Sequence, residues 1–175
     1  EKCSVDFGPE IGVQKYMQWQ FYRQWRSLRQ FAADRGIRVI GDIPIFVAYD
    51  SADVWCRRDL FHMDSRGRSV DVAGVPPDYF SKTGQLWGNP LYNWDLMARD
   101  GYSWWVDRFR YMFEIFDVVR VDHFRGFEAA WHVPASHRTA QRGQWIKGPG
   151  ADLFDAVFSR LGSLPIIAED LGVIT

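Results

Sequence analysis

Two short apolar segments of the sequence end in a carboxylic acid, and these acids are well placed to do chemistry. Asp122 follows Val118-Val119-Arg120-Val121, and Glu169 follows Ile166-Ile167-Ala168. An ionised, oriented carboxylate can attack as a nucleophile, and a protonated carboxylic acid can give its proton to a departing oxygen. The two groups together indicate cleavage of a glycosidic bond by a nucleophile and an acid/base.

Arg120 is a further reason to single out Asp122. Residues two apart on a β-strand point to the same face, so Arg120 should lie beside the Asp122 carboxylate. A nearby cation favours the ionised form of an acid, which is the form that a nucleophile needs. The same spacing also fits a structural ion pair buried in a barrel, and spacing alone does not decide between the two interpretations.

The other acids near strand ends allow two interpretations each. An apolar setting with a second carboxylate opposite favours a protonated Glu169, but a strand-end acid can also cap the next helix. Asp170 should point to the opposite face, and we interpret it as a structural acid. Asp42 ends the run Arg38–Gly41 and precedes Ile43-Pro44. It is either a binding or supporting carboxylate, or a turn acid before an X-Pro step.

Helices and strands must bring these acids together. Apolar residues recur at helical spacing in three segments, and short apolar runs that end in acids are typical of buried parallel strands. Two irregular stretches cover 46–101 and 123–150, and we expect short strands or turns in the first. The expected order is helix 13–34 ended by Gly36, strand 38–42, helix 103–116 capped by Ser103, strand 118–122, helix 151–161 and strand 165–170.

This alternation predicts an α/β fold with parallel strands and right-handed helical crossovers. The connections that follow the strands are long, whereas the helix-to-strand connections near Gly36, Asp117 and Ser163 are short. In (β/α)8 barrels the catalytic groups lie on the loops at the carboxyl ends of the strands, so the asymmetry favours a TIM barrel. A doubly wound open sheet is the alternative.

Composition narrows the class of ligand. With 21 basic and 22 acidic residues the net charge is −1, so no strong field attracts nucleic acid or a membrane surface. No apolar run approaches the roughly 20 residues of a membrane helix, and the first residues do not resemble a signal peptide. Aromatic residues make up 17% of the chain, with nine Trp, and flat amphipathic rings suit sugar faces.

Local spacing gives no evidence for a metal or cofactor site. No two histidines have the His-x-x-x-His spacing, and the segment from Asp64 to Asp71 lacks the closing Glu of a calcium loop. His123 follows Asp122 and could donate to a sugar hydroxyl. The remaining histidines, His62, His132 and His137, are interpreted as loop or core residues.

The two cysteines indicate the redox state of the cellular compartment. Cys3 and Cys56 form no disulfide framework, which favours a reducing environment. The sequence alone leaves the pairing of these two residues open.

Four ordered segments carry a more specific pattern. They are Gly41-Asp42-Ile43-Pro44-Ile45-Phe46-Val47, Gly74-Val75-Pro76-Pro77-Asp78-Tyr79-Phe80 continuing through Gly84-Gln85-Leu86-Trp87-Gly88-Asn89-Pro90-Leu91-Tyr92, Arg120-Val121-Asp122-His123-Phe124-Arg125-Gly126, and Ala168-Glu169-Asp170-Leu171-Gly172. These segments resemble, in order, the first signature, the active-site loop, the nucleophile motif and the acid/base motif of the amylomaltase family, also called disproportionating enzymes or 4-α-glucanotransferases. The resemblance covers essentially the whole chain.

The resemblance implies a role for each matched residue. Asp122 falls on the nucleophile, Glu169 on the acid/base, and Arg120 on the arginine that orients the nucleophile. Substrate-contacting positions fall on His123, Asp42, Trp87 and Tyr79, the last two in the loop that covers bound glucan.

The resemblance also implies an activity and its setting. The family transfers α-1,4-glucan segments between maltooligosaccharides with retention, through a covalent glycosyl-enzyme, in starch and glycogen metabolism. It needs no metal or organic cofactor. Its enzymes are mostly cytoplasmic in bacteria, which is the location that we expect, and plastidial in plants.

The family pattern extends beyond this sequence. Its third catalytic carboxylate, an Asp in a His-Asp motif, lies after the position of Thr175, and a complete barrel takes about 250 residues. We therefore expect residues 1–175 to be a fragment of a single catalytic barrel domain, roughly strands three to five, with an active-site loop insertion at about 46–101. Little or no turnover is expected from the fragment alone, and its open sheet edges give it a route to self-association.

Two other functions fit part of the pattern. A magnesium-dependent barrel enzyme of the enolase type also has acids at the ends of successive strands, although Arg120 would compete with the ion. A non-catalytic glucan-binding fragment would use the aromatic residues equally well, but it has no need for Arg120 beside Asp122.

Overall fold

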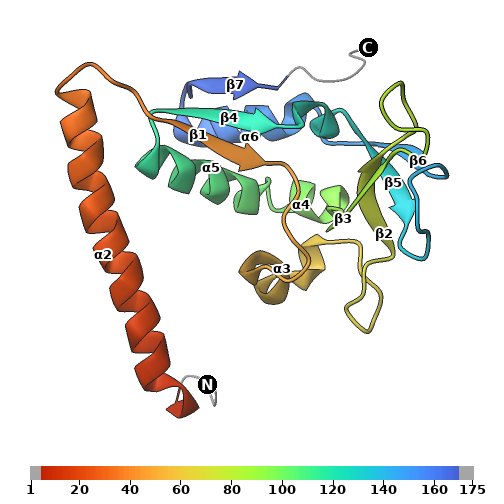
Figure 1. Ribbon diagram of the computed structural model, residues 1–175, viewed down its shortest axis with the longest axis horizontal. Coiled ribbons are helices and arrows are strands. Elements are labelled where there is room, and N and C mark those ends of the chain that lie inside the picture. The colour runs from red at the N-terminus through yellow and green to blue at the C-terminus, as the bar shows by residue number, and fades with distance from the viewer. Residues whose placement is uncertain (1–4, 170–175) are drawn as a thin grey trace.

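A three-stranded parallel sheet, in the order β1-β4-β7, forms one half of the molecule in the computed structural model, which describes residues 5–169 (Figure 1). Its strands are β1 (Ile40–Pro44), β4 (Val118–Asp122) and β7 (Ile166–Ala168). The register pairs Pro44 with Asp122 and Val121 with Ala168, so the three carboxyl ends lie side by side. The parallel strands predicted from the apolar runs are therefore confirmed.

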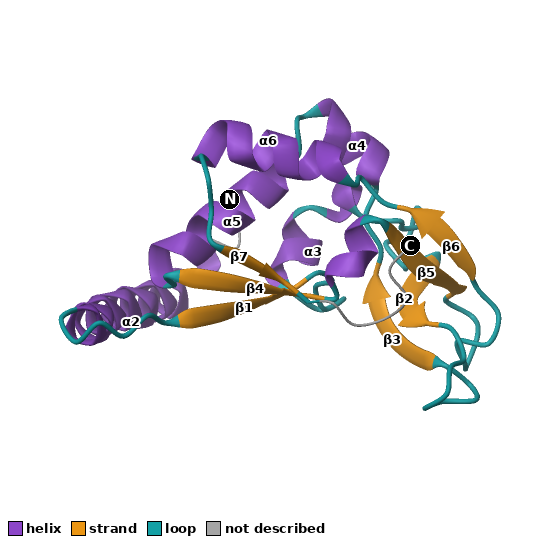
Figure 2. Ribbon diagram, turned by 90° about the horizontal axis from the view of Figure 1, so that it is seen from above, coloured by secondary structure: helices purple, strands orange, loops and turns teal. Residues whose placement is uncertain are grey.

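Helices α5 (Ser103–Ile115) and α6 (Ala151–Leu161) lie on the same side of this sheet (Figure 2). Strand β4 turns Val119 and Val121 into the core beneath the helices, while Arg120 and Asp122 are only partly buried on its other face. The period of two along the strand thus separates an apolar, helix-covered face from a face that carries the polar residues. The core is rich in aromatic rings, among them the fully buried Trp105, Tyr92, Phe109 and Phe127.

A second sheet is antiparallel and has the strand order β3-β2-β5-β6. Its strands are β2 (Asp71–Val75), β3 (Gln85–Pro90), β5 (Ala129–Pro134) and β6 (Gln144–Lys147). The first two come from the irregular stretch 46–101 and the other two from 123–150, so both stretches combine into one layer beyond the ends of β1 and β4 (Figure 1). The chain therefore has a mixed α/β fold with a parallel and an antiparallel sheet.

Short helices fill the connections around these sheets. The first irregular stretch also contains α3 (Ala52–Cys56), η1 (Arg58–Leu60) and α4 (Trp94–Arg99), and the second begins with η2 (Phe124–Phe127). Ser51 caps α3 and Asn93 caps α4, in each case with a side-chain oxygen that accepts a backbone N–H.

Helix α2 (Gly8–Ala33) extends away from the rest of the molecule (Figure 1). It buries none of its residues, and it is held near its C-terminal end by Trp25, whose indole N–H donates to the carbonyl of Ile115 at 2.7 Å. Beyond the helix, Gly36 has a φ of +70°, which a glycine adopts readily at a helix end. None of the helices within residues 5–169 is long and apolar enough to cross a membrane.

Several predicted boundaries are corrected. The first helix begins at Gly8 instead of residue 13, and β1 and β7 cover 40–44 and 166–168 instead of 38–42 and 165–170. Ser103 does not cap α5: it is the first helical residue, and its hydroxyl and N–H both donate to Asp100. The boundaries 118–122 and 151–161 are confirmed. Cys56 is exposed, whereas Cys3 and Asp170 lie outside the described residues.

Candidate active site

Arg120 is the centre of a cluster of carboxylates at the ends of the parallel strands. Its Nη1 donates to Asp42 Oδ1 at 2.6 Å, and its Nη2 donates both to Asp122 Oδ1 at 2.9 Å and to Glu169 Oε1 at 2.6 Å. Each of the three strands contributes one acid: Asp42 lies in the middle of β1, Asp122 ends β4, and Glu169 directly follows β7. These bonds, first those to Asp42 and Asp122, hold the pKa of Arg120 above its ordinary value, so the guanidinium stays charged.

The shared nitrogen limits the distance between Asp122 and Glu169. Because Oδ1 of Asp122 and Oε1 of Glu169 both bond Nη2 of Arg120, at 2.9 and 2.6 Å, their separation cannot exceed the sum of these lengths. That limit equals the upper end of the ~5–5.5 Å between the carboxyl groups of retaining glycosidases. The two acids are thus close enough to act on the two sides of one glycosidic bond.

The backbone after β4 fixes the second oxygen of Glu169. His123 has a φ of +52°, in the left-handed region that a non-glycine residue adopts only at a cost. This turn aims the His123 N–H at Oε2 of Glu169, at 2.5 Å, while the Glu169 N–H extends the strand pairing by donating to Val121 O at 3.1 Å. Both oxygens of Glu169 therefore accept hydrogen bonds, in place of the apolar setting expected from Ile166-Ile167-Ala168.

Aromatic rings border the cluster on the side of the antiparallel sheet. The His123 ring meets Trp87 edge-on, with centroids 4.8 Å apart, and also contacts Phe46. Burial lowers the pKa of His123 despite the nearby charges of Glu169 and Asp122, so its imidazole is neutral at pH 7. Trp87 is positioned through Asn89, whose amide donates to Val47 O at 3.0 Å and ties β3 to the segment after β1.

The structure does not bring Tyr79 to this cluster. Its side chain is 98% exposed, and its ring contacts only the neighbouring Phe80 among the described residues. The Asp78 carboxylate accepts the N–H groups of Phe80 and Ser81, which shapes the turn that holds Tyr79 out in solvent. The other six predicted site residues, Asp42, Trp87, Arg120, Asp122, His123 and Glu169, do come together.

Two side chains fix the end of β1 by hydrogen bonds to its backbone and to the residue that follows it. The buried Tyr92 hydroxyl donates to Ile45 O at 2.6 Å, and Arg108 Nη2 donates to Pro44 O at 2.8 Å. Burial raises the pKa of Tyr92 far above its ordinary value, so the hydroxyl keeps its proton and remains a donor. These contacts fix the chain just beyond Asp42, and local sequence spacing gave no indication of them.

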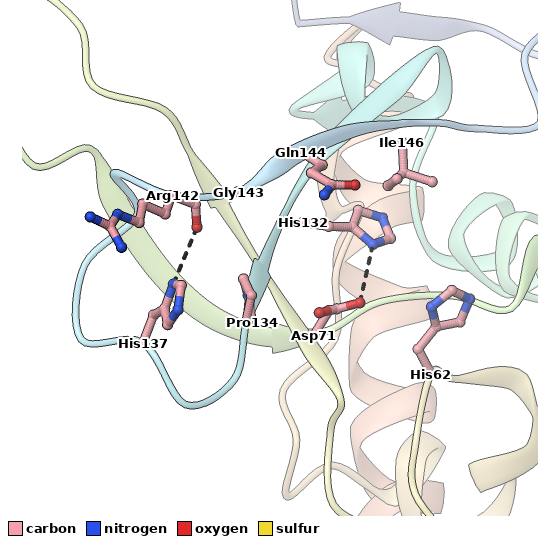
Figure 3. Close-up of a pocket in the computed structure, with 9 residues that line it drawn as sticks. All are labelled: His62, Asp71, His132, Pro134, His137, Arg142, Gly143, Gln144 and Ile146. Carbon is pink, nitrogen blue, oxygen red and sulfur yellow. Dashed lines mark hydrogen bonds and ion pairs between the residues drawn. The ribbon is translucent and has the colours of Figure 1, made fainter.

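One group of possible ligands was also missed. His62, Asp71 and His132 meet at the antiparallel sheet (Figure 3), and none of them is among the residues of the Arg120 cluster. Their separation along the chain hid them from a search for local metal-ligand spacing. The available signal was a histidine inside the apolar strand sequence Ala129-Ala130-Trp131-His132-Val133.

Comparison with known proteins shows the family to which this chain belongs. The model of the 4-alpha-glucanotransferase family matches residues 1–175. The 4-alpha-glucanotransferase of Thermus thermophilus is 55% identical over 166 residues, which cover 95% of this chain and 33% of the relative. That of Streptococcus pneumoniae is 54% identical over 175 residues, which cover all of this chain and 35% of the relative.

A solved structure agrees with these sequence matches. Amylomaltase from Streptococcus agalactiae in complex with acarbose has a TM-score of 0.94 and 42% identity, and the alignment covers 98% of this chain and 35% of that chain. The chain spans about a third of the length of the curated relatives that it matches. By the family match over its whole length and by these identities, the chain belongs to the 4-alpha-glucanotransferase family.

Proposed function

We propose that this chain carries the nucleophile and the acid/base of a 4-α-glucanotransferase, which transfers α-1,4-glucan segments between maltooligosaccharides with retention. The observation that carries the proposal is the bridge through Arg120 Nη2, which holds Asp122 and Glu169 within the separation of a retaining pair. The family membership and the acarbose complex of the Streptococcus agalactiae amylomaltase support glucan as the substrate class.

The reaction proceeds in two displacements. Asp122 Oδ attacks the anomeric carbon while Glu169 gives a proton to the departing glycosidic oxygen, and a covalent glycosyl-enzyme forms. Glu169 then takes the proton of an acceptor 4-hydroxyl, whose oxygen displaces Asp122 and restores its carboxylate. Arg120 orients Asp122 through its hydrogen bond. Asp42, His123 and Trp87 contact the glucan at the cluster, and Tyr79 contacts it from the exposed turn after β2.

The surroundings of Glu169 hold its carboxyl group in place for proton transfer. Arg120 donates to one of its oxygens and the His123 N–H to the other. The first displacement uses Glu169 as a proton donor, and the second uses it as a proton acceptor. Trp87 beside His123 offers a ring on which an acceptor sugar can stack and exclude water, which favours transfer over hydrolysis.

We further propose that β1, β4 and β7 are neighbouring strands, three to five, of a (β/α)8 barrel that forms one catalytic domain. Successive parallel strands lie next to each other, and helices cover one face only. Ile40 and Ile167 are exposed on the polar face, and the remaining strands of a longer chain would cover them and close both sheet edges. The antiparallel sheet is the loop insertion at about 46–101 enlarged by 123–150.

Arg120 distinguishes this proposal from the metal-dependent alternative. Its guanidinium takes the place between three carboxylates that a magnesium ion would need in an enolase-type site. A non-catalytic glucan-binding role does not require this arrangement either. Both alternatives predict that the unchanged complete protein transfers no glucan segments.

The test uses the complete protein that contains this sequence, with maltotriose as substrate and longer oligosaccharides as readout. Glu169→Gln should lower transfer by about 10²–10⁴-fold, the usual contribution of an acid/base. Asp122→Asn should remove transfer, and mass spectrometry of Glu169→Gln after incubation with substrate should find a glycosylated peptide containing Asp122. Asp107→Asn, on the exposed side of α5, is the matched control and should transfer normally. Near-normal transfer by Asp122→Asn would refute the proposal.

Three accompanying proposals concern the chain by itself and its location. Residues 1–175 should show little or no disproportionation of maltotriose, because the third carboxylate of the family is missing from them. Their open sheet edges should cause concentration-dependent association in analytical ultracentrifugation. The complete protein should fractionate with the cytoplasm of its source.

A further inference from the structure

Three side chains with metal-binding atoms converge on the antiparallel sheet. The ligand atoms of His62, Asp71 and His132 all lie within 4.8 Å of one another. Figure 3 shows the three side chains around one pocket, which has a volume of about 500 Å³ and is also lined by His137 and Gln144. This group shares no residue with the Arg120 cluster and has no part in the proposed transfer reaction.

The pairing of β2 with β5 sets the positions of Asp71 and His132. His132 lies opposite Ala73, and Asp71 lies opposite Pro134. Residues two apart on a strand share a face, so Asp71 and His132 project from the same face as diagonal neighbours.

Backbone hydrogen bonds hold His62 against this face. Its N–H donates to Leu91 O at 2.8 Å, and its carbonyl accepts the N–H of Val70, the residue before Asp71, at 3.1 Å. His62 is thus tied to β2 through its main chain on one side and to the end of β3 on the other. All three side chains come from backbone that is fixed by regular pairing, as a preformed site requires.

The distances suit an ion better than they suit direct contacts. His132 Nδ1 and Asp71 Oδ2 are 4.0 Å apart, too far for a hydrogen bond. Zinc takes nitrogen and oxygen ligands at about 2.0–2.2 Å in tetrahedral geometry, which puts two ligands of one ion roughly 3.3–3.6 Å apart. The Asp71–His132 pair needs to close by only about 0.5 Å, and pairs at the 4.8 Å limit of the group by roughly 1.4 Å, to reach this separation.

The nitrogens of both imidazole groups are available to a ligand. His132 has 8% of its side chain exposed and lines the pocket, and its ring meets that of His62 edge-on, with centroids 5.8 Å apart. Within residues 5–169 neither ring makes a hydrogen bond, so no such bond has to break when the nitrogens bind an ion. Burial chiefly lowers the pKa of His132 to about 4, which leaves a neutral ring with a lone pair at pH 7.

We propose that His62, Asp71 and His132 bind one zinc ion, with water from the pocket as its fourth ligand. Two imidazoles and one carboxylate with an open position are a set that zinc uses, whereas calcium and magnesium prefer oxygen ligands alone. The ion would join β2, β5 and the segment after η1, which come from both irregular stretches of the chain. It stabilises the antiparallel sheet, and no reaction is assigned to it.

The test measures binding of zinc to the complete protein after removal of any affinity tag and of bound metal with a chelator. Calorimetric titration with Zn²⁺ should give one equivalent per chain, and Co²⁺ as a probe should give the visible absorption of a low-symmetry nitrogen and oxygen site. His62→Ala, His132→Ala and Asp71→Asn should each weaken binding at least about tenfold, since even outer-shell changes cost 10–100-fold. Zn²⁺ should also raise the Tm of the unchanged protein.

His137→Ala provides the matched control. His137 lines the same pocket, but its Nδ1 lies 3.3 Å from the carbonyl of Arg142 and it is outside the three-residue group, so this variant should bind Zn²⁺ normally. If His132→Ala fails to fold, the partly exposed His62 and the isosteric Asp71→Asn change still report on the site. Absence of binding, or equal affinity in all four variants, would overturn the proposal. Glucan transfer is measured separately, so neither result bears on the roles of Asp122 and Glu169.

Discussion

Helices α2 and α5 are both rich in aromatic residues, but their surroundings differ completely. Helix α5 has 13 residues and buries Trp105, Val106 and Phe109, whereas α2 has 26 residues and buries none. Both sequences show an apolar stripe at helical spacing, so amphipathicity alone does not distinguish them. An apolar stripe indicates that a helix packs against another surface. Only the structure shows whether that surface belongs to residues 5–169.

The largest expected effect on stability comes from a substitution in the core-facing side of α5. Trp105 is fully buried, and its ring contacts those of Tyr92, Phe109 and Phe127. Trp105→Ala should lower the free energy of unfolding of residues 1–175 by about 3–5 kcal/mol, the usual cost of removing a large core side chain. Urea unfolding followed by circular dichroism measures this change. A loss below 1 kcal/mol, taken as a rough threshold for an exposed site, would contradict the contrast with α2.

The next effect concerns the point where α2 and the sheet meet. A Cβ on Gly41 of β1 would lie 2.1 Å from Cδ2 of Phe116, whose ring also packs edge-on against Trp25 of α2. Gly41→Ala should therefore displace Phe116 and cost about 1–3 kcal/mol, as overpacking does. Equilibrium unfolding in urea checks the value. Gly12→Ala, in α2 with no atom near its added Cβ, is the control and should not destabilise the chain.

A smaller effect concerns the ion pair that fastens the same end of α2. Asp117 Oδ1 accepts two hydrogen bonds from Arg29, at 2.9 and 2.7 Å, and Oδ2 accepts the N–H of Val39 at 2.8 Å. Asp117→Asn should cost on the order of 1.5 kcal/mol, the lower value for hydrogen bonds to a charged group. An unchanged midpoint of urea unfolding at pH 7 would show that Arg29 and Asp117 do not anchor the helix.

The same pair has a pH dependence of definite sign. The Val39 N–H, and then Arg29, hold the pKa of Asp117 below its ordinary value. An acid whose pKa is lowered by folding stabilises the protein above its unfolded pKa of about 3.9, and this contribution is lost as the pH falls through the lower folded value. Stability measured from pH 7 downward should thus fall more steeply in the unchanged chain than in Asp117→Asn.

Much of the parallel half of the molecule could be predicted from the sequence. The segments 118–122 and 151–161 have the predicted boundaries because a continuous apolar run and a strong helical period leave few alternatives. The placement of Arg120 beside Asp122 also followed from the period of two along a strand. Local rules are sufficient wherever the interaction lies within one element.

Contacts between distant segments could not be predicted in this way. Strand β2 pairs with β5 although β3, α4, α5 and β4 lie between them in the sequence, and no hairpin turn in the sequence indicates that pairing. The bond from the His123 N–H to Glu169 depends on a left-handed backbone turn at a residue that rarely adopts one. The meeting of His62, Asp71 and His132 depends on the same long-range pairing.

The smallest expected effect lies in the exposed stripe of α2. Met17 and Leu28 are 51% and 54% exposed, and Met, Leu and Ala all favour helices, so their replacement by Ala changes little besides apolar surface. In residues 1–175, Met17→Ala and Leu28→Ala should each change the free energy of unfolding by no more than about 0.5 kcal/mol. In a complete barrel that covers this stripe, the same changes should cost about 2 kcal/mol or more, as for buried aliphatic residues. Parallel urea titrations of the two chain lengths measure the difference. Equal small effects in both would mean that α2 projects into solvent in the complete protein as well, because a covered stripe cannot lose these side chains without cost.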